Sequence, residues 1–254
     1  MKISKRILSL LLALALCLGL APLLPRAEAA GVTINSTNFP DANFRSYVSS
    51  NFDTNHDSYL NDSEINSIWK IDVHEMGVTD MKGVEYFTAL EELNCSLNPK
   101  ITSLNVSRNK SLKYLFCAET KITSLDLSSN KNLKVLSCVN TKITMLDVTR
   151  CCLDELMVKN CANLKTLYCQ GNNLRYLVLI GCTALETLNC GDNRIGALAA
   201  DEAPALKTLN CEKNGMINLY FGTALESLNC SENSLTNLNV SSCKALKQLD
   251  FSYN

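Results

Sequence analysis

The sequence predicts a repeat solenoid, in which short parallel β-strands from successive coils stack side by side behind a small helical N-terminal cap. Three observations predict it. A six-residue segment ending in cysteine recurs along most of the chain, a second apolar segment recurs about midway between copies, and a helical apolar pattern precedes the first copy. Alternating apolar residues turn one strand face inward, and stacked coils bury together what one coil cannot bury alone.

The cysteine-ended segments carry most of this prediction. They read LEELNC, LKYLFC, LKVLSC, LKTLYC, LETLNC, LKTLNC and LESLNC, and they end at Cys95, Cys117, Cys138, Cys169, Cys190, Cys211 and Cys230. A second series, which includes ITSLNV, ITSLDL, ITMLDV, LRYLVL and LTNLNV, lies between them. The Leu-x-x-Leu-x-Cys frame is followed by Asn98, Asn172, Asn193, Asn214 and Asn233, as in leucine-rich repeats. The predicted fold is therefore a leucine-rich-repeat parallel β-coil stack with 21–22-residue repeats over residues 71–254.

One coil departs from this period. The cysteines step by 22, 21, 31, 21, 21 and 19 residues, and the 31-residue step separates Cys138 from Cys169. Either a half-coil is inserted near residues 148–164 or one coil bulges, and both interpretations stay open at this point.

The cysteine column predicts buried free thiols more than disulfides. Residues one coil apart stack at about 4.8 Å, the spacing of neighbouring strands, whereas a disulfide needs Cβ atoms about 3.8 Å apart with a specific dihedral angle. A second cysteine column, formed by Cys151, Cys161, Cys182 and Cys243, stands where earlier coils have Asn109 and Asn130. Cysteine behaves as a small hydrophobic residue in such positions.

Residues 1–29 predict a secretory signal peptide. Three basic residues precede an apolar run over 7–21, and Ala27-Glu28-Ala29 fits a small-x-small cleavage site. Without this segment the chain has 20 basic and 24 acidic residues, a balance that does not favour nucleic acid as a partner. No later segment reaches transmembrane length, so we expect a secreted or bacterial cell-surface protein with no membrane span after cleavage.

Residues 30–70 predict a helical cap that contains an EF-hand-like loop. Phe44, Val48 and Phe52 indicate one helix, and Ile65, Ile68 and Trp69 indicate a second. The loop between them places oxygen ligands in the EF-hand order at Asp53, Asn55, Asp57, Tyr59, Asn61 and Glu64. Ser58 stands where the motif has glycine, so the loop predicts weak Ca²⁺ binding. The alternative is a helix-capping loop in which Asn61 and Glu64 form a capping box.

These features together resemble the internalin family, most closely its cysteine-ladder type, over residues 34–254. The resemblance implies a curved parallel solenoid on the bacterial surface, whose partner is a protein on another cell or in the extracellular matrix. The EF-hand-like loop departs from it and looks more like the caps of related surface proteins of gut-dwelling Gram-positive bacteria. The sequence contains no Leu-Pro-x-Thr-Gly sorting signal, and it stops mid-coil at Phe251–Asn254, so we expect a solenoid truncated at its C-terminus.

The outward strand positions of the earlier cysteine-ended segments predict a partner-binding patch. Its candidate residues are Tyr114, Phe116, Val135, Val139, Met157 and Tyr168. Aromatic and apolar side chains on an exposed face are typical of contact sites. The predicted function is protein–protein interaction or adhesion. A glycan-binding module and a structural stalk that presents a missing domain are the alternatives. An enzyme is not expected, because His56 and His74 are the only histidines and no catalytic set accompanies them.

Overall fold

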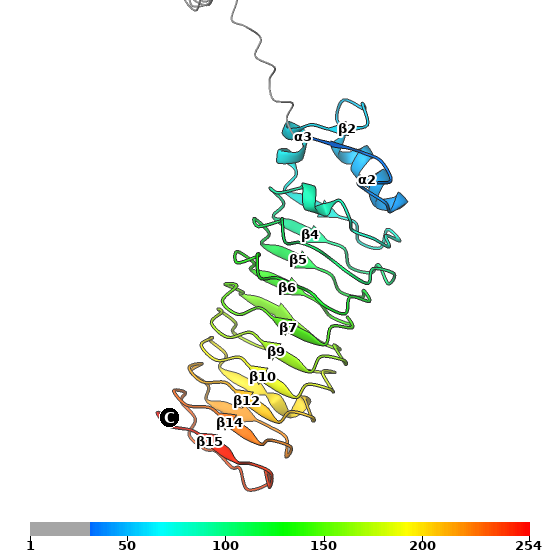
Figure 1. The fold of residues 1–254 in the computed structure, drawn as a ribbon. Helices are drawn as coiled ribbons and strands as arrows, with labels where there is room; N and C mark the ends of the chain where they lie inside the picture. The colour runs from blue at the N-terminus through cyan, green and yellow to red at the C-terminus, as the bar shows by residue number, and fades with distance from the viewer. Residues whose placement is uncertain (1–30) are drawn as a thin grey trace, which may run out of the picture.

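The computed structural model describes residues 31–254 and shows an elongated parallel β-solenoid, with the cap at one end and the last strand at the other (Figure 1). The predicted solenoid is thereby confirmed. The predicted signal peptide lies outside the described residues. Within residues 31–254, no helix is both long and apolar enough to cross a bilayer.

The cap consists of two short strands and two helices, β1 (Val32–Thr33), α2 (Ala42–Phe52), β2 (Tyr59–Leu60) and α3 (Asp62–Ser67). The solenoid strands are β3 (Lys70–Asp72), β4 (Glu92–Asn94), β5 (Tyr114–Phe116), β6 (Val135–Ser137), β7 (Met145–Asp147), β8 (Glu155–Met157), β9 (Thr166–Tyr168), β10 (Thr187–Asn189), β11 (Ala197–Ala199), β12 (Thr208–Asn210), β13 (Asn218–Tyr220), β14 (Ser227–Asn229) and β15 (Gln248–Asp250). Two 3₁₀ turns, η1 (Val84–Tyr86) and η2 (Ala200–Glu202), complete the elements.

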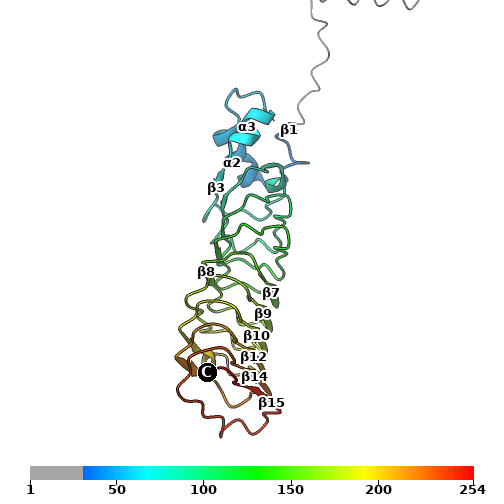
Figure 2. The same cartoon turned by 90° about the vertical axis from the view of Figure 1, so that its left-hand side faces the viewer.

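The coil strands form parallel sheets along two opposite sides of the stack. One sheet has the order β3-β4-β5-β6-β8, and its side continues through residues 174–180 to the pair β11-β13. The other has the order β7-β9-β10-β12-β14-β15. Figure 2 shows β3 and β8 along one edge of the solenoid and the β7-to-β15 sheet along the other. We call these sides the β5 face and the β10 face.

The register of the strands explains the 31-residue step. Leu136 of β6 pairs with Leu156 of β8, and Leu146 of β7 pairs with Leu167 of β9, so neighbouring coils remain 20 and 21 residues apart. No coil bulges here. The Leu-x-x-Leu-x-Cys segment instead moves by half a coil, from the β5 face to the β10 face. The expectation that all cysteine-ended segments share one face is therefore wrong, because a half-coil displacement carries each later segment to the opposite sheet.

The core lies between the two sheets and is built from leucine and cysteine. Leu115, Leu136, Leu188 and Leu209 are all buried, as the period predicts. Residues 31–254 contain twelve cysteines; all are free thiols, and only Cys152 is exposed. The cysteine column thus contributes to the packing of the core as small apolar side chains, and not as disulfide bonds.

The turn asparagines form a hydrogen-bonded ladder, as predicted. The Asn193 Nδ2 group donates to the carbonyls of Cys169 and Cys190, at 3.0 Å each, and its Oδ1 accepts from the Leu174 amide at 3.1 Å. One amide side chain therefore joins three backbone groups from neighbouring coils. Buried backbone groups need such partners, because leaving them unpaired costs about 1–3 kcal/mol each.

The second cysteine column replaces part of this ladder. The Cys161 thiol donates to the Cys138 carbonyl at 3.0 Å, and the Cys182 thiol donates to the Val158 carbonyl at 3.2 Å. A thiol is a weak donor, but here it reaches a carbonyl of the preceding coil, as the Asn side chains do. The cysteines therefore occupy positions on the inner wall of the coil and leave no cavity there.

The cap is fixed to the first coil through Asp41, which is the N-cap of α2. Its carboxylate accepts from the Phe44 amide at 2.8 Å and from the amide and hydroxyl of Thr79 at 2.8 and 2.7 Å. Burial by itself would raise the pKa of Asp41, but these hydrogen bonds outweigh it and hold the pKa below its ordinary value. The second predicted helix is shorter than expected. Trp69 lies beyond α3 and is 58% exposed, because the chain there already extends into β3.

Candidate binding faces

The β5 face collects most of the predicted partner-binding residues. Tyr114 of β5 lies beside Val135 of β6, and Phe116, Ser137 and Met157 follow one another across β5, β6 and β8. Val139 lies just beyond β6, where its carbonyl accepts from the Glu119 amide. Tyr114 is exposed, Ser137 is buried and the others are half-buried. Five of the six predicted residues therefore lie on one face.

Tyr168 does not join this cluster. It lies in β9, between Asp147 of β7 and Asn189 of β10, on the opposite side of the solenoid. The half-coil displacement separates it from Phe116, although both residues occupy the same place in their cysteine-ended segments.

Other residues extend the β5 face instead. In the next coil Tyr176, Val178 and Ile180 alternate outward, at 50%, 41% and 44% exposure. The later coils add Ala199 of β11 and Tyr220 of β13, which are direct partners in the register. The sequence signal was the segment LRYLVLI, in which Tyr176, Val178 and Ile180 alternate with buried leucines. It was overlooked because the predicted patch was drawn only from the cysteine-ended segments, and this segment belongs to the second series.

The β10 face is the more polar of the two, although Met145 and Tyr168 also lie on it. Its outward positions include a column of Thr166, Thr187, Thr208 and Ser227 and a column of Asn189, Asn210 and Asn229. The Asn side chains are already engaged, because each Oδ1 accepts from the amide two residues later, at 3.1 Å. These bonds end each strand in a tight turn. The two faces therefore differ in chemistry, one more apolar and one more polar.

Charged residues border the N-terminal part of the β5 face. Lys70 pairs with Glu92 at 2.9 Å, and Lys113 pairs with Glu91 at 2.7 Å. The hydrogen bond and charge of Glu92 raise the pKa of Lys70. Both pairs are solvent-exposed, so they contribute little to stability. They do place a polar margin beside the apolar residues, as at the rim of protein interfaces.

Burial disfavours the thiolate form of most ladder thiols. Burial raises the pKa of the Cys95 and Cys169 thiols to about 12, because the thiolate would lose its hydration. Cys161 differs, since hydrogen bonding from Cys138 lowers its pKa, yet its side chain is also buried. The cysteine column therefore serves packing, as its spacing predicted.

The EF-hand-like loop adopts a capping arrangement. Both Asp53 carboxylate oxygens accept backbone amides, from Asp57 at 3.1 Å and Ser58 at 3.0 Å. Ser58 has φ 62°, the left-handed conformation that glycine adopts most readily. The loop joins α2 to α3 as the motif requires, with Tyr59 in the short antiparallel pair of β2 with β1.

Glu64 joins the two ends of this loop through hydrogen bonds. Its Oε1 accepts from the amide and hydroxyl of Thr54 at 2.9 and 2.6 Å, and its Oε2 accepts from the Asn61 amide at 3.0 Å. Asn61 reciprocates by capping α3, so the capping box is present. The Thr54 hydroxyl bond is the main cause that lowers the pKa of Glu64. Within residues 31–254, no group of three or more His, Cys, Asp or Glu side chains lies close enough together to hold a metal ion.

Comparison with known proteins agrees with the repeat architecture. Residues 162–201 match the family described as Leucine Rich repeats (2 copies). Internalin J of Listeria monocytogenes serotype 4b is 34% identical over 71 residues, which cover 28% of this chain and 8% of that protein. The chain thus matches only a small part of the length of this relative.

Solved structures with similar folds include further internalins. The functional domain of internalin J from Listeria monocytogenes, described as including a cysteine ladder, is 27% identical, with a TM-score of 0.40 over 86% of this chain and 56% of that chain. Internalin C2 of the same species is 21% identical, with a TM-score of 0.44 over 88% of this chain and 100% of that chain. By its repeats, this chain is a leucine-rich-repeat protein, and a stretch of 71 residues is similar to internalin J.

Proposed function

We propose that this protein is a secreted or cell-surface binding module that holds a protein partner against the β5 face. The partner belongs to another cell or to the extracellular matrix. One observation carries the proposal, namely the run of outward apolar side chains that crosses consecutive coils from β5 to β13. Leucine-rich-repeat solenoids use extended surfaces of this kind for binding.

The dimensions of the run suit a protein interface. From Tyr114 to Tyr220 it crosses six coils, which at about 4.8 Å per strand gives a length of roughly 24 Å. Aromatic and large apolar side chains supply most of the binding energy in such interfaces, provided that polar groups surround them. The ion pairs beside β4 and β5 supply part of that surround.

The test uses binding of the labelled protein to epithelial cells, before and after the cells are treated with protease. We expect saturable binding that protease removes. The double variant Phe116→Ala, Tyr176→Ala should weaken binding at least about tenfold, since each truncation of a central aromatic typically costs 1 kcal/mol or more.

Tyr168→Ala is the matched control, because it removes a half-buried tyrosine from the β10 face. It should bind as the unmodified protein does. Equal binding by the double variant and the unmodified protein would exclude the β5 face. Binding that survives protease but is lost after glycosidase treatment would favour the glycan alternative.

We also propose that the loop Asp53–Glu64 binds Ca²⁺ weakly. Asp53, Asn55, Asp57 and Glu64 offer the oxygen atoms that Ca²⁺ prefers, and the left-handed Ser58 gives the backbone the required turn. To contribute both oxygens, Glu64 must leave Thr54 and Asn61, and this competition lowers the affinity. We therefore expect a dissociation constant on the order of 10⁻⁴ to 10⁻³ M.

Calcium should then stabilise the cap. At about 10 mM Ca²⁺ the expected gain is roughly 1.4–2.7 kcal/mol, measured as a rise in the melting temperature and as titration heat. Glu64→Gln should abolish the response. Asp62→Asn, which lies outside the ligand positions, should keep it. If Ca²⁺ at this concentration changes neither the melting temperature of the unmodified protein nor the titration heat, the loop does not bind Ca²⁺.

A further inference from the structure

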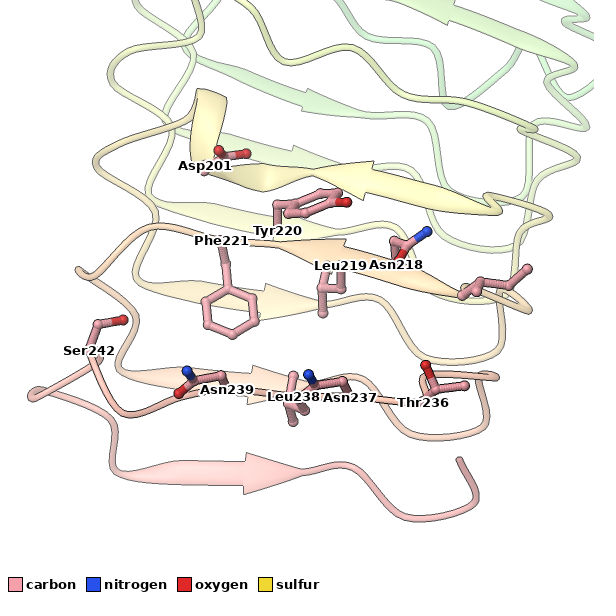
Figure 3. A pocket seen from close by; sticks show the side chains of 11 residues that line it. Asp201, Asn218, Leu219, Tyr220, Phe221, Thr236, Asn237, Leu238, Asn239 and Ser242 are labelled. Carbon is pink, nitrogen blue, oxygen red and sulfur yellow. The ribbon is translucent and has the colours of Figure 1, made fainter.

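The C-terminal part of the β5 face contains a recess. It lies between β13 and the segment 236–239 and has a volume of about 360 Å³ (Figure 3). Its lining consists of Asp201, Ile217, Asn218, Leu219, Tyr220, Phe221, Thr236, Asn237, Leu238, Asn239 and Ser242. This volume lies at the small end of the roughly 300–1,000 Å³ range of ligand sites.

Local packing explains why the recess exists. Leu177 and Leu198 are buried at the inward position of the two preceding coils, whereas Leu219 and Leu238 at the same position are only partly buried. Phe221 stands where the preceding coil has Ala200, and Figure 3 shows its ring projecting between β13 and the segment below. The coil from Cys211 to Cys230 is also shorter than its neighbours, at 19 residues. Leu238 belongs to the last coil on this face within residues 31–254, so its side chain and that of Leu219 beside it remain partly accessible.

The walls of the recess carry polar groups without protein partners. Within the described residues, no hydrogen bond forms to the side chains of Asn218, Asn237, Tyr220 or Asp201. Asn239 uses its Oδ1 to accept from the Ser241 amide and keeps its amide donors. Asn218 and Asn237 differ in this respect from Asn239 and from the asparagines of the β10 face, whose Oδ1 atoms accept from the amide two residues later. The recess therefore offers free donors and acceptors beside an exposed aromatic ring.

We propose that this recess binds one neutral sugar residue, with an N-acetylhexosamine as the favoured ligand. Tyr220 is 57% exposed and offers an aromatic face to the C–H side of a pyranose ring. The amides of Asn218 and Asn237 can both donate to and accept from ring hydroxyls. The partly exposed Leu219, Phe221 and Leu238 suit an N-acetyl methyl group.

The charge of the lining decides which sugars fit. Asp201 is its one ionisable carboxylate, and no lysine, arginine or histidine lines the recess. A carboxylate accepts hydroxyl donors well but repels a sialic or uronic acid. Anionic sugars are therefore excluded and neutral sugars are favoured. This site goes beyond the proposed protein-binding function. It shares Tyr220 with the protein-binding run, so Asn237→Ala, which lies outside that run, tests the sugar site separately.

The experiment titrates the full chain with methyl glycosides of N-acetylglucosamine, N-acetylgalactosamine, glucose and sialic acid, followed by saturation-transfer NMR. We expect millimolar binding of an N-acetylhexosamine, with contacts to the acetyl methyl and to one ring face. Tyr220→Ala should weaken binding at least tenfold, and Tyr220→Phe should weaken it less because the stacking ring remains. Asn237→Ala should also weaken binding, since it removes a donor–acceptor pair.

Tyr176→Ala is the control, because it removes an equally exposed tyrosine outside the recess. It should bind sugar normally even if it loses the protein partner. Circular dichroism verifies that each variant folds. No saturable binding of any neutral glycoside would overturn the proposal, as would preferential binding of sialic acid or equal binding by Tyr220→Ala and the unmodified protein.

Discussion

Replacing Asn193 with leucine is expected to lower the free energy of unfolding by about 3 kcal/mol or more, although leucine is close to asparagine in size. The amide joins the Cys169 and Cys190 carbonyls to the Leu174 amide. Leucine leaves the buried Leu174 amide unpaired, at about 1–3 kcal/mol. It also removes one of two hydrogen bonds from each carbonyl, at about 0.5–1.5 kcal/mol each, because Asn172 and Asn214 still donate to them. Urea unfolding followed by circular dichroism measures the loss.

Asn189→Leu is the control for this substitution. Asn189 is half-buried on the β10 face, and its side chain makes a single, partly buried hydrogen bond, which it accepts from the Gly191 amide. Its loss should cost about 1 kcal/mol, because one hydrogen bond is lost instead of three. If Asn193→Leu and Asn189→Leu destabilise the protein equally, the ladder does not support the coils in the way argued here.

Leu136→Ala and Leu146→Ala should each destabilise the protein by about 2–5 kcal/mol, because each opens a cavity in a tightly packed core. The two leucines belong to the coil in which the cysteine-ended segment leaves the β5 face. Both are almost completely buried, at 0% and 1% exposure. Both substitutions should lower the free energy of unfolding by a similar, large amount only if the leucine columns of the β5 face and of the β10 face both continue through this coil.

Met145→Ala gives the matched control in the same strand as Leu146. Met145 points outward and is 52% exposed, so its truncation should cost less than about 0.5 kcal/mol. A bulged coil would leave one of the two leucines loosely packed. A small cost for either leucine would therefore contradict the register of β6 with β8 or of β7 with β9.

The sequence predicted those features that depend on repetition. Leu-x-x-Leu-x-Cys at near-constant spacing required stacked coils, because no other arrangement buries every copy. The same spacing predicted the buried thiols and the asparagine ladder, since each depends only on the position of a residue within its own coil. The capping box at Asn61 and Glu64 was likewise local, as its partners lie three residues apart.

The candidate site was less predictable, because it depends on which coils face the same way. Phe116 and Tyr168 occupy equivalent positions in their segments, yet they lie on opposite faces. Tyr176 and Tyr220 belong to the second series and were overlooked because the predicted patch was drawn only from the cysteine-ended segments. The recess beside Tyr220 depends on how Phe221 fits against a neighbouring coil, which spacing alone does not reveal.

The sequence by itself determined that the chain is a leucine-rich-repeat solenoid with a leucine and cysteine core. Stacked coils are the arrangement that buries every copy of a periodic apolar segment. Only the tertiary structure decided the faces. A 31-residue step fits both a bulge and a half-turn, and the parallel pairing of Leu136 with Leu156 and of Leu146 with Leu167 selects the half-turn. Hydrogen bonding between coils, not the repeat within a coil, therefore sets which side chains share a surface.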